Sequence, residues 1–387
     1  MSKYLLEEDQ KLINNIQFFL EQIENKQVAL YALKDEDKLI GKFISMCSES
    51  TKIAEIDKFI KNQTHFVVPA SNLKHFFKEL KEHKDYSEEE VSALESVRYS
   101  ENQWILNFKD IQISILEKKL CYYISEKLRR RTAANMMVAF HIIDYCNLNC
   151  QMCNKFSPIA KKKYVPSESV IKDAWRLSEL TGGQLERIII TGGEPLLHPE
   201  LEGIVHNVHK AFENTPIQIQ TNGLLLKNND FRLYRLCKDN NAFLWITQYP
   251  IDFDYQSTIK SIRNFGGQIK MALDEEKTSW KFPIDINGEQ EKFWMFFCWM
   301  HGQCINCVDG KIFPCGFIHS SKNFETTFGC HLKRSDRDYI DIYKAENFSD
   351  ISVFLSDYQP FCANCRIKDW EIDIPWRTSM RSIDEWT

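Results

Sequence analysis

Three cysteines at a short spacing are the residues of this chain best suited to chemistry. Cys146, Cys150 and Cys153 form a C-x3-C-x2-C pattern just after the apolar run 136–143, which predicts a buried strand. Thiolates this close in sequence can converge on one soft metal centre. Three protein ligands leave a four-iron cluster one ligand short, so one iron has an open coordination site. A cofactor or substrate can bind at such an open site.

A zinc site and a group of core thiols are the alternatives. Structural zinc takes four ligands, commonly as paired C-x2-C knuckles, and a free cysteine can also pack as a small apolar side chain. A second motif, TGGEP at residues 191–195, favours the cluster. It closes a predicted strand at 187–191, and its glycines let the backbone approach a ligand closely.

Together the two motifs resemble the signature of the radical S-adenosylmethionine (SAM) superfamily. The resemblance implies that Cys146, Cys150 and Cys153 hold a [4Fe-4S] cluster whose open iron chelates the amino and carboxylate groups of SAM. In that family the reduced cluster cleaves SAM to methionine and a 5'-deoxyadenosyl radical, which takes a hydrogen atom from the substrate. The protein then supplies ligation, orientation and exclusion of water.

The resemblance also implies a set of residues that bind SAM. The TGGEP turn holds the amino group of SAM in the family, polar turns after the next strands lie at the same cleft, and the residue before the last cluster cysteine lies against adenine. Here that last residue is Met152 where many members have an aromatic, and Tyr145 partly compensates. The expected cofactor-binding residues are Tyr145, Met152, Gly192, Gly193, Glu194, Pro195, Thr221, Asn222 and Thr247.

A second group of cysteines lies near the end of the chain. Seven of the 13 cysteines fall between Cys298 and Cys365. A cysteine, then a G-x4-C hairpin at 310–315, then a distant C-x2-C pair resemble the twitch/SPASM extension of radical SAM enzymes, which holds auxiliary iron–sulfur clusters. No cysteine follows Cys365, so we expect a shortened extension with one auxiliary [4Fe-4S] cluster.

The ligands of the auxiliary cluster are expected among six of these cysteines. The favoured four are Cys298, Cys315, Cys362 and Cys365, with Cys304 competing for the first place and Cys330 as a substitute. Two clusters, one of them with an open site, are also compatible with seven cysteines. A further alternative is a zinc ribbon, in which Cys304 and Cys307 pair with the C-x2-C at 362–365.

The elements around the cluster motif predict the fold. Five strands are expected, at 136–143, 187–191, 217–220, 243–247 and 268–272, with helices between them. Continuous apolar strands between helices indicate a parallel sheet covered on both faces. The fold class is therefore α/β, and the pattern resembles the partial (β/α)6 barrel of the superfamily. Ligands in such sheets bind at the carboxyl ends of the strands, where all the motifs fall.

Three domains are expected, namely an N-terminal α/β domain at 1–133, the barrel at 134–290 and the cysteine-rich extension at 291–387. The N-terminal pattern is strand, helix, strand, with a strand pair at 104–108 and 111–116. The turn 32–37 contains acidic residues and no glycine, so we expect no nucleotide there. Recognition of the substrate and a structural role both remain open for this domain.

Composition narrows the classes of partner. A net charge of -5 does not favour nucleic acid as a partner, and no apolar run approaches the roughly 20 residues that span a bilayer. The first ten residues show no signal-peptide pattern, and 13 cysteines are expected to serve metal binding in a reducing compartment. We therefore expect a cytoplasmic protein without membrane partners. Trp370, Trp376 and Trp386 are expected to cap a core.

The expected function is that of an oxidoreductase-type radical SAM enzyme. The first interpretation is oxidative modification of a peptide side chain, as a crosslink or dehydrogenation, or its epimerisation, in the maturation of a natural product. For epimerisation, Cys237, Cys307 and Cys330 are candidate thiols that return a hydrogen atom. The alternatives are a sugar or another small molecule as substrate, and a non-catalytic iron–sulfur scaffold or electron carrier. An external one-electron reductant such as flavodoxin or ferredoxin is implied in the catalytic cases.

Overall fold

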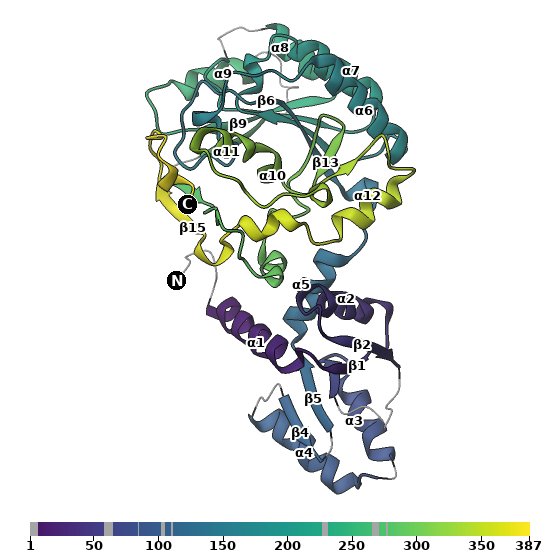
Figure 1. The fold of residues 1–387 in the computed structure, drawn as a ribbon. Helices are drawn as coiled ribbons and strands as arrows, with labels where there is room; N and C mark the ends of the chain where they lie inside the picture. The colour runs from purple at the N-terminus through teal and green to yellow at the C-terminus, as the bar shows by residue number, and fades with distance from the viewer. Residues whose placement is uncertain are drawn as a thin grey trace. The chain divides into compact units, whose positions relative to one another are not determined.

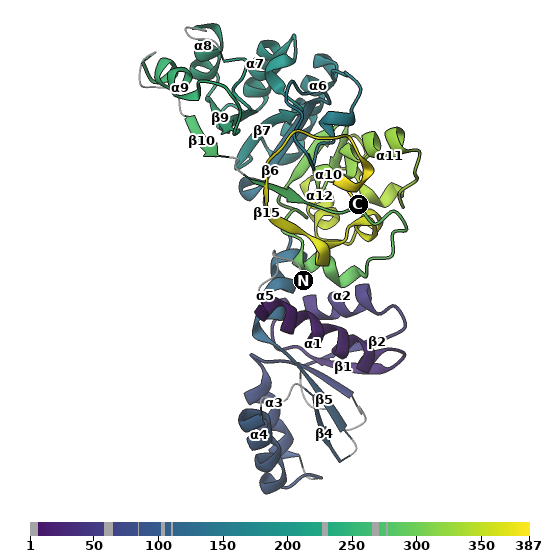
Figure 2. The ribbon, with the colours of Figure 1, turned by 90° about the vertical axis from the view of Figure 1, so that its left-hand side faces the viewer.

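The computed structural model describes eight stretches of the chain, namely 7–57, 65–83, 85–101, 105–109, 111–226, 231–264, 271–275 and 278–387. The chain forms two compact units (Figures 1 and 2). One unit contains Leu5–Arg129 together with Glu291–Phe297, and the other contains Arg130–Gln290 and Cys298–Thr387. The cysteine-rich segment, for which a domain of its own was expected, thus lies in the same unit as the cluster motif.

The N-terminal unit is built on a five-stranded sheet in the order β2-β1-β3-β5-β4. Neighbouring strands are parallel except for the β4–β5 hairpin. The strands are β1 Gln27–Tyr31, β2 Lys52–Ile56, β3 His65–Pro69, β4 Ile105–Phe108 and β5 Ile111–Leu116. Their order along the chain confirms the predicted strand–helix–strand pattern and the hairpin. The buried aromatic rings of Phe66 and Phe76 pack together at 5.3 Å in its core.

Helices connect these strands. They are α1 Glu7–Ile23, α2 Lys38–Cys47, α3 Leu73–Glu82, α4 Glu88–Glu101 and α5 Lys118–Leu128. In α3 the buried residues Leu73, Phe76, Phe77 and Leu80 recur at helical spacing, so one face of the helix covers the sheet. The short 3-10 helix Lys292–Phe297 belongs to this unit, and Phe296 contacts Phe43 of α2 with ring centroids 4.9 Å apart.

The turn after β1 is occupied by a side chain of the protein. The carboxylate of Asp37 accepts hydrogen bonds from the backbone N–H groups of Leu33 and Lys34, at 3.1 and 2.9 Å. Asn72 donates to the same carboxylate oxygen at 2.9 Å. In a dinucleotide-binding domain the phosphates use backbone donors at this turn. Here an acidic side chain takes those donors.

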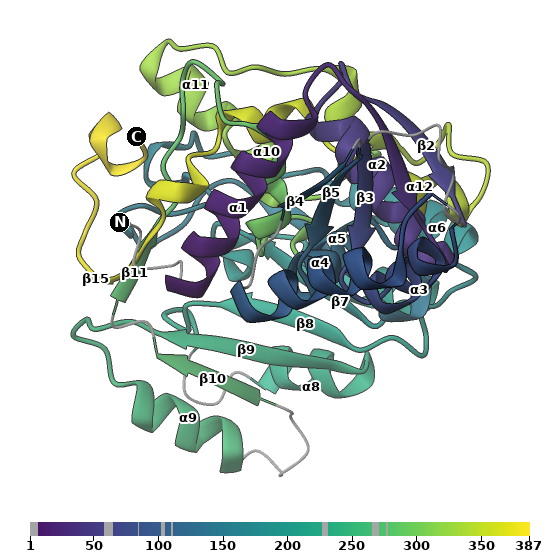
Figure 3. The same ribbon diagram turned by 90° about the horizontal axis from the view of Figure 1, so that it is seen from below.

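The larger unit is built on an eight-stranded sheet in the order β10-β9-β8-β7-β6-β12-β13-β14. Strands β6 to β10 are all parallel to their neighbours, and Figure 3 shows β7 to β10 side by side. The strands are β6 Met137–Ile143, β7 Arg187–Gly192, β8 Ile217–Thr221, β9 Ala242–Gln248, β10 Met271–Glu275, β12 Ile305–Val308, β13 Lys311–Phe313 and β14 Ile340–Asp341. The predicted partial barrel is confirmed.

The sixth parallel strand of this sheet is β12, which the sequence did not indicate. Strand β12 pairs in parallel with β6, with Cys307 opposite Phe140, and then turns back as the antiparallel β13. The cysteine-rich segment therefore extends the barrel sheet at β6. The predicted fifth strand at 268–272 begins at Met271 in the structure, and residues 268–270 lie outside the described residues.

Helices α6, α7 and α8 follow one another along one side of this sheet (Figures 1 and 2). The helices are α6 Ser167–Thr181, α7 Leu201–Ala211, α8 Phe231–Asp239, α9 Tyr255–Asn264, α10 Gly316–Ser320, α11 Lys322–Phe328 and α12 Phe348–Leu355. The buried residues of α7 are Leu201, Ile204, Val205, Val208 and Ala211, which form one helical face. None of the helices in the described ranges is long and apolar enough to cross a membrane.

Candidate active site

The three cysteines of the opening motif lie on the loop that follows β6, at the carboxyl edge of the sheet. Burial raises the pKa of the Cys146 thiol, and the neighbouring thiols of Cys153 and Cys150 raise it further. The backbone N–H of Leu148 donates to Cys146 Sγ at 3.4 Å. Grouped thiols that are removed from water ionise only beside a positive charge, which bound iron provides. The donor set therefore fits a three-cysteine cluster.

The glycines of the TGGEP turn are needed where the turn packs against the cluster loop. A Cβ atom on Gly192 would lie 2.2 Å from the carbonyl oxygen of Ile143, and one on Gly193 would lie 2.0 Å from that of Tyr145. The backbone N–H of Gly193 donates to the Ile143 carbonyl at 2.7 Å. The sequence analysis expected these glycines to make room for a ligand. The structure shows that they make room for the cluster loop itself.

Glu194 is the acidic residue of this turn, and it is only 1% exposed. One carboxylate oxygen accepts hydrogen bonds from the backbone N–H of Leu196 at 3.0 Å and from the hydroxyl of Thr221 at 2.8 Å. The other oxygen accepts from the backbone N–H of Asn222 at 2.9 Å. A carboxylate offers about four acceptor positions, so about one is left for an ammonium group. Burial raises the pKa of Glu194 to about 7.

Asn222 joins the end of β8 to the cluster loop. Its side-chain nitrogen donates to Asn147 Oδ1 at 2.8 Å and lies 3.6 Å from Cys146 Sγ. The hydroxyl of Tyr255, on α9, donates to the Asn222 carbonyl at 2.9 Å and accepts from the backbone N–H of Tyr249 at 3.3 Å. Tyr255 was not expected at the site, because no motif includes it. It ties the ends of β8 and β9 together.

The remaining residues that were expected to bind SAM lie around the same loop. Met152 is buried and has a positive φ of 54°, a backbone conformation that is uncommon for residues other than glycine. Tyr145 is half-buried, with Lys162 Nζ 5.8 Å from its ring centroid. Thr247 lies half-buried near the end of β9, and Pro195 begins a 3-10 helix after the turn. Their roles toward SAM stay predictions.

The cysteines of the second group come together around Cys315. Burial raises the pKa of the Cys315 thiol well above its ordinary value, and three nearby thiols raise it further, those of Cys298, Cys304 and Cys362. The pKa of Cys365 is likewise raised well above the usual range, by burial and then by Cys362, Cys298 and Cys315. The structure thus brings together the four cysteines that the sequence favoured as auxiliary ligands, with Cys304 beside them.

The remaining candidate cysteines have other surroundings. Cys307 lies on β12, where burial and the charges of Asp173 and Asp309 raise its pKa. Cys304 precedes this strand, and it is Cys304, not Cys307, whose thiol acts on Cys315. Burial is also the first cause of the raised pKa of Cys330, followed by the charge of Glu325. Cys237 is buried on α8, and burial alone raises its pKa to about 12.

The spacing of the sulfurs bears on the choice between a cluster and a single ion. In the described part of the chain, one group of at least three His, Cys, Asp or Glu ligand atoms lies within 4.8 Å of one another, and it consists of His141, Asp144 and His319. Around tetrahedral zinc, with Zn–S bonds of about 2.3 Å, sulfurs lie about 3.8 Å apart. Among the described residues, no three sulfurs of either cysteine group lie as close together as the atoms of that histidine group.

The histidine group itself has basic neighbours. His141 and Asp144 form a hydrogen bond of 2.6 Å between Nε2 and Oδ1. Burial lowers the pKa of His141, and the charges of Lys155 and Lys163 lower it further. Positive charges at this place disfavour a metal cation. The group is therefore better explained as a buried ion pair or hydrogen bond at the end of β6.

A segment near the end of the chain holds the cluster loop from outside. Gln151 donates from its backbone N–H to the Arg377 carbonyl at 3.0 Å and from Nε2 to the Pro375 carbonyl at 2.6 Å. The indole N–H of Trp386 donates to the carbonyl of Cys153 at 3.0 Å. Trp370 and Trp386 are buried, which confirms that they cap a core. We call residues 375–387 the clamp segment. No sequence motif indicated that this segment contacts the cluster loop.

A cavity of about 460 Å³ opens beside the cluster loop. One wall is the loop itself, residues 150–154, which includes two of the three cluster cysteines. The other walls consist mainly of aromatic side chains, namely Tyr249, Trp280, Phe282, Trp299 and Trp376. A molecule in this cavity would lie directly against the segment that binds the iron. The cavity is therefore the candidate substrate site.

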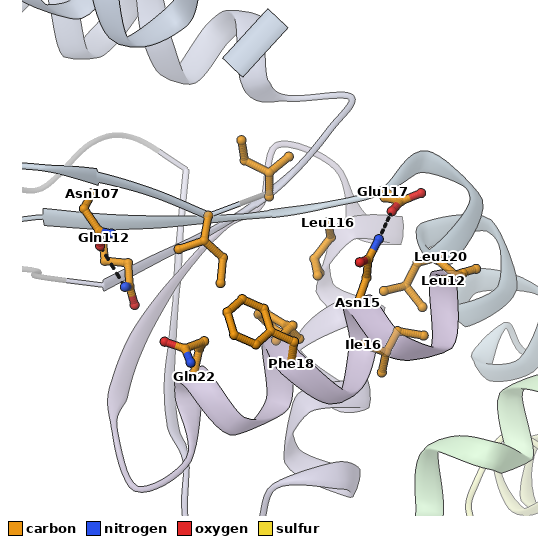
Figure 4. Close-up of a pocket in the computed structure, with 13 residues that line it drawn as sticks. Leu12, Asn15, Ile16, Phe18, Gln22, Asn107, Gln112, Leu116, Glu117 and Leu120 are labelled. Atoms are coloured by element: carbon orange, nitrogen blue, oxygen red, sulfur yellow. Dashed lines mark hydrogen bonds between the residues drawn. The ribbon is translucent and has the colours of Figure 1, made fainter. Parts of the chain in front are cut away.

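A second cavity, of about 470 Å³, lies in the N-terminal unit between α1 and the strands β4 and β5 (Figure 4). Its lining is apolar apart from a few amides and one acidic residue. Asn15 donates to that residue, Glu117, at 2.6 Å, and Gln112 donates to Asn107 at 2.8 Å. No cationic side chain is among the described residues that line it. The described lining of this cavity therefore offers no cation to a phosphate.

Comparisons with known proteins agree with this geometry. The Radical SAM superfamily model matches residues 140–258, a range that contains both the cluster loop and the TGGEP turn. A GTP 3',8-cyclase of Aquifex aeolicus is 30% identical over 248 residues, which cover 58% of this chain and 75% of that protein. The chain belongs to the radical SAM superfamily.

Other radical SAM proteins match over a smaller share or at lower identity. A GTP 3',8-cyclase of Peptoclostridium acidaminophilum is 35% identical over 152 residues, 38% of this chain and 44% of that protein. Among solved structures, BtrN in complex with AdoMet and 2-DOIA is 15% identical, with 61% of this chain and 94% of that chain covered and a TM-score of 0.40. Streptococcus suis SuiB bound to precursor peptide SuiA is 12% identical, with 72% and 84% covered and a TM-score of 0.31.

The pKa of Glu194 predicts how SAM binding to this radical SAM site depends on pH. Burial raises this pKa from 4.5 to about 7. The ionised carboxylate is a stronger acceptor for the N–H groups of the iron-bound amino group than the neutral carboxyl is, so we expect SAM affinity to rise as pH increases through 7. Folding stability changes with pH in the opposite direction. The stability that this carboxyl contributes is present below pH 4.5 and is lost as pH rises through 7. Calorimetric titration with SAM between about pH 6 and pH 8 measures the first effect.

The Glu194→Gln variant is the control for this prediction. Glutamine cannot ionise, so the slope of SAM affinity against pH should disappear. Loss of a hydrogen bond to a charged group, worth about 1.5–3 kcal/mol, should weaken SAM binding by about 10- to 100-fold. A wild-type affinity that does not change with pH, or a variant that keeps the slope, would contradict the role of Glu194.

The clamp segment predicts a loss of stability when Trp386 is shortened. Trp386 is 1% exposed and its ring packs 5.7 Å from that of Phe156. We expect Trp386→Ala to lower the free energy of unfolding by about 3–5 kcal/mol. Trp386→Phe should cost less, about 1–3 kcal/mol, because it keeps an aromatic ring but removes the hydrogen bond to Cys153 and part of the buried ring volume. Urea unfolding of the anaerobic protein measures both.

The matched control for the clamp is Trp175→Ala. Trp175 lies on α6 and is 46% exposed, so its removal should change the free energy of unfolding by at most about 0.5 kcal/mol. If Trp386→Ala costs no more than this control, the clamp segment does not hold the cluster loop.

Proposed function

We propose that this radical SAM protein is an enzyme that dehydrogenates or crosslinks a side chain of a peptide substrate, with one auxiliary [4Fe-4S] cluster. The observation that carries the proposal is that one compact unit contains both cysteine groups and an aromatic cavity against the cluster loop. When bound, the two clusters would supply one-electron chemistry, namely reductive cleavage of SAM at the first, which would let the adenosyl radical take a hydrogen atom from the substrate, and uptake at the second of the electron that the substrate loses together with a proton to solvent.

The residues of the chain have defined tasks in this proposal. Cys146, Cys150 and Cys153 bind the first cluster, and Glu194 holds the amino group of SAM with its remaining acceptor position. Asn222 fixes the cluster loop through Asn147. Cys298, Cys315, Cys362 and Cys365 bind the auxiliary cluster, with Cys304 as the alternative to Cys298.

An oxidative outcome is favoured over epimerisation. Epimerisation needs a thiol that faces the substrate and returns a hydrogen atom. The three candidate thiols, Cys237, Cys307 and Cys330, are not among the described residues that line the cavity beside the cluster loop. The auxiliary cysteine group, which would hold the electron acceptor, lies in the same unit as the cluster loop.

The lining of the cavity also bears on the class of substrate. The relatives with the printed name GTP 3',8-cyclase act on a triphosphate. None of the described residues that line this cavity is Lys or Arg, so it offers no cation to a phosphate chain. An uncharged sugar is the second candidate, because tryptophan rings and amide groups also suit a sugar ring.

The proposal includes a compartment and a partner. Iron–sulfur ligation by this many cysteines requires thiols that are kept reduced, which is the condition of the cytoplasm. An external one-electron donor such as flavodoxin or ferredoxin would reduce the first cluster. We propose no nucleic acid or membrane partner.

The test uses the anaerobically reconstituted protein with SAM, a reductant and candidate precursor peptides. We expect one 5'-deoxyadenosine for each modified peptide, and a product that is lighter by two hydrogen atoms in mass spectrometry. A product of unchanged mass that has gained solvent deuterium at one carbon would show epimerisation instead. Turnover of a sugar but of no peptide would favour the second candidate.

A further inference from the structure

The aromatic residues around the cavity beside the cluster loop are not fully packed by the protein. Trp280 is 39% exposed and Trp299 is 36% exposed, and their rings meet edge to face with centroids 5.4 Å apart. Large apolar side chains that remain exposed next to one another mark binding sites rather than core. Phe282 supports the pair from behind, at 6.0 Å from Trp280 and 6.1 Å from Trp299.

A second aromatic pair completes the walls. Tyr249, which follows β9, and Trp376, which follows β15 Glu371–Pro375, have ring centroids 5.9 Å apart. Both line the same cavity as Trp280 and Trp299. The occupant would therefore meet ring faces and edges contributed by separate segments of the chain. Aromatic side chains bind one another in such offset and edge-to-face arrangements.

The described residues that line the cavity include no Asp, Glu, Lys or Arg. The polar groups among its described lining residues are amides and hydroxyls, namely those of Gln151, Asn154, Thr278, Ser279 and Tyr249. None of the described lining residues offers a cation to a carboxylate or a phosphate, so an anionic occupant is disfavoured. The volume of about 460 Å³ lies within the range of about 300–1,000 Å³ that is typical of ligand pockets.

A strand edge lies at the rim of the cavity. Strand β11, Thr278–Lys281, pairs with β15 on one edge, and in the described part of the chain these two strands form a sheet of their own. Thr278, Ser279 and Trp280 belong both to β11 and to the cavity lining. An extended peptide can add to such an edge through backbone hydrogen bonds, and alternate side chains then enter neighbouring pockets.

We propose that this cavity binds an uncharged aromatic side chain of an extended peptide that lies along β11, between the Trp280–Trp299 pair and the Tyr249–Trp376 pair. The inference rests on the proposed function and specifies its substrate as a peptide with an aromatic residue at or next to the reacting position. The clustered rings select the side chain, and the strand edge holds the backbone.

The experiment measures peptide binding to the anaerobic holoenzyme with SAM by calorimetry. The probes are capped pentapeptides Gly-Ser-X-Ser-Gly in which X is Trp, Ala or Glu, together with methyl glucoside and GTP. We expect the Trp peptide to bind about 10- to 100-fold more tightly than the Ala and Glu peptides, as expected for burial of one large ring. Trp280→Ala and Trp299→Ala should each remove most of this preference.

Two further variants keep the test decisive. Trp280→Phe retains an aromatic ring and should keep the preference, while Trp175→Ala, on α6 outside the cavity, should leave it unchanged. Equal binding of the Trp and Ala peptides would overturn the inference. So would binding of methyl glucoside or GTP that is lost in Trp280→Ala, because the site would then serve another class of ligand.

Formation of 5'-deoxyadenosine in the same samples separates the inference from the proposed function. Normal SAM cleavage without a preference for the Trp peptide overturns the inference alone. A clear preference without SAM cleavage supports the cavity as an aromatic site and overturns the catalytic proposal.

Discussion

Replacement of Cys146, Cys150 or Cys153 by alanine is expected to remove about four irons from each chain and to abolish SAM cleavage. Each cysteine supplies one of only three protein ligands, so the loss of one leaves too few thiolates to hold the cluster. Iron and sulfide analysis of anaerobically reconstituted protein measures the first effect, and chromatography of 5'-deoxyadenosine measures the second. A fall in SAM cleavage of at least about 1,000-fold is expected, because the chemistry itself is lost.

The control for this prediction is Cys121→Ala in the N-terminal unit. Cys121 is half-buried on α5, and its thiol donates to the Leu116 carbonyl at 3.8 Å. Both residues belong to the N-terminal unit. Its replacement should leave the iron content and SAM cleavage unchanged. A cluster variant that retains its full iron content would show that another residue is the ligand.

The double variant Cys298→Ala/Cys315→Ala is expected to contain about four irons fewer than the wild-type protein, because it loses the auxiliary cluster and keeps the first one. Both thiols belong to the group that also includes Cys362 and Cys365. Because the substrate could no longer lose its second electron, we expect the oxidised peptide to fall by at least about 100-fold. Abortive cleavage of SAM should continue. This separation of the two products distinguishes the auxiliary site from the first cluster.

Two matched variants support this second prediction. Cys330→Ala and Cys307→Ala change two other cysteines of the same segment. The charged neighbours of these two cysteines are carboxylates rather than thiols. Both should keep the full iron content. An auxiliary variant that loses zinc instead of iron would contradict the prediction, as would a double variant that keeps the oxidised product.

The sequence predicted those parts of the molecule that depend on local pattern. The apolar run before Cys146 became β6, Met137–Ile143, and the runs at 187–191 and 217–220 became β7 and β8 with boundaries within one residue. The hairpin of β12 and β13 also brings Cys315 back to Cys304, so this part of the second cysteine group follows from a local pattern. Short-range periodicity and turn residues suffice for such features.

The features that the sequence did not indicate depend on contacts between distant segments. Trp386 donates to the carbonyl of Cys153, and the Tyr255 hydroxyl joins Asn222 to Tyr249. No local pattern marks such pairs, because their partners are fixed only when the sheet has formed. The same reason explains why the pairing of β12 with β6 was missed.

The TGGEP turn shows a second limit of motif reading. The motif located the site, but it assigned the glycines to the ligand. The structure shows that a Cβ at Gly193 would collide with the backbone of Tyr145. The turn is thus also a packing element for the cluster loop, and the role of its glycines toward SAM stays a prediction.

The central claim is that the three-cysteine loop holds an iron–sulfur cluster whose open iron binds and cleaves SAM. The most direct measurement is the electron paramagnetic resonance spectrum of the dithionite-reduced double variant Cys298→Ala/Cys315→Ala, recorded with and without SAM and followed by analysis for 5'-deoxyadenosine. We predict a reduced [4Fe-4S] signal that shifts when SAM is added, and formation of 5'-deoxyadenosine. A protein that contains zinc and no iron, or a cluster signal that SAM leaves unchanged with no 5'-deoxyadenosine formed, would contradict the claim.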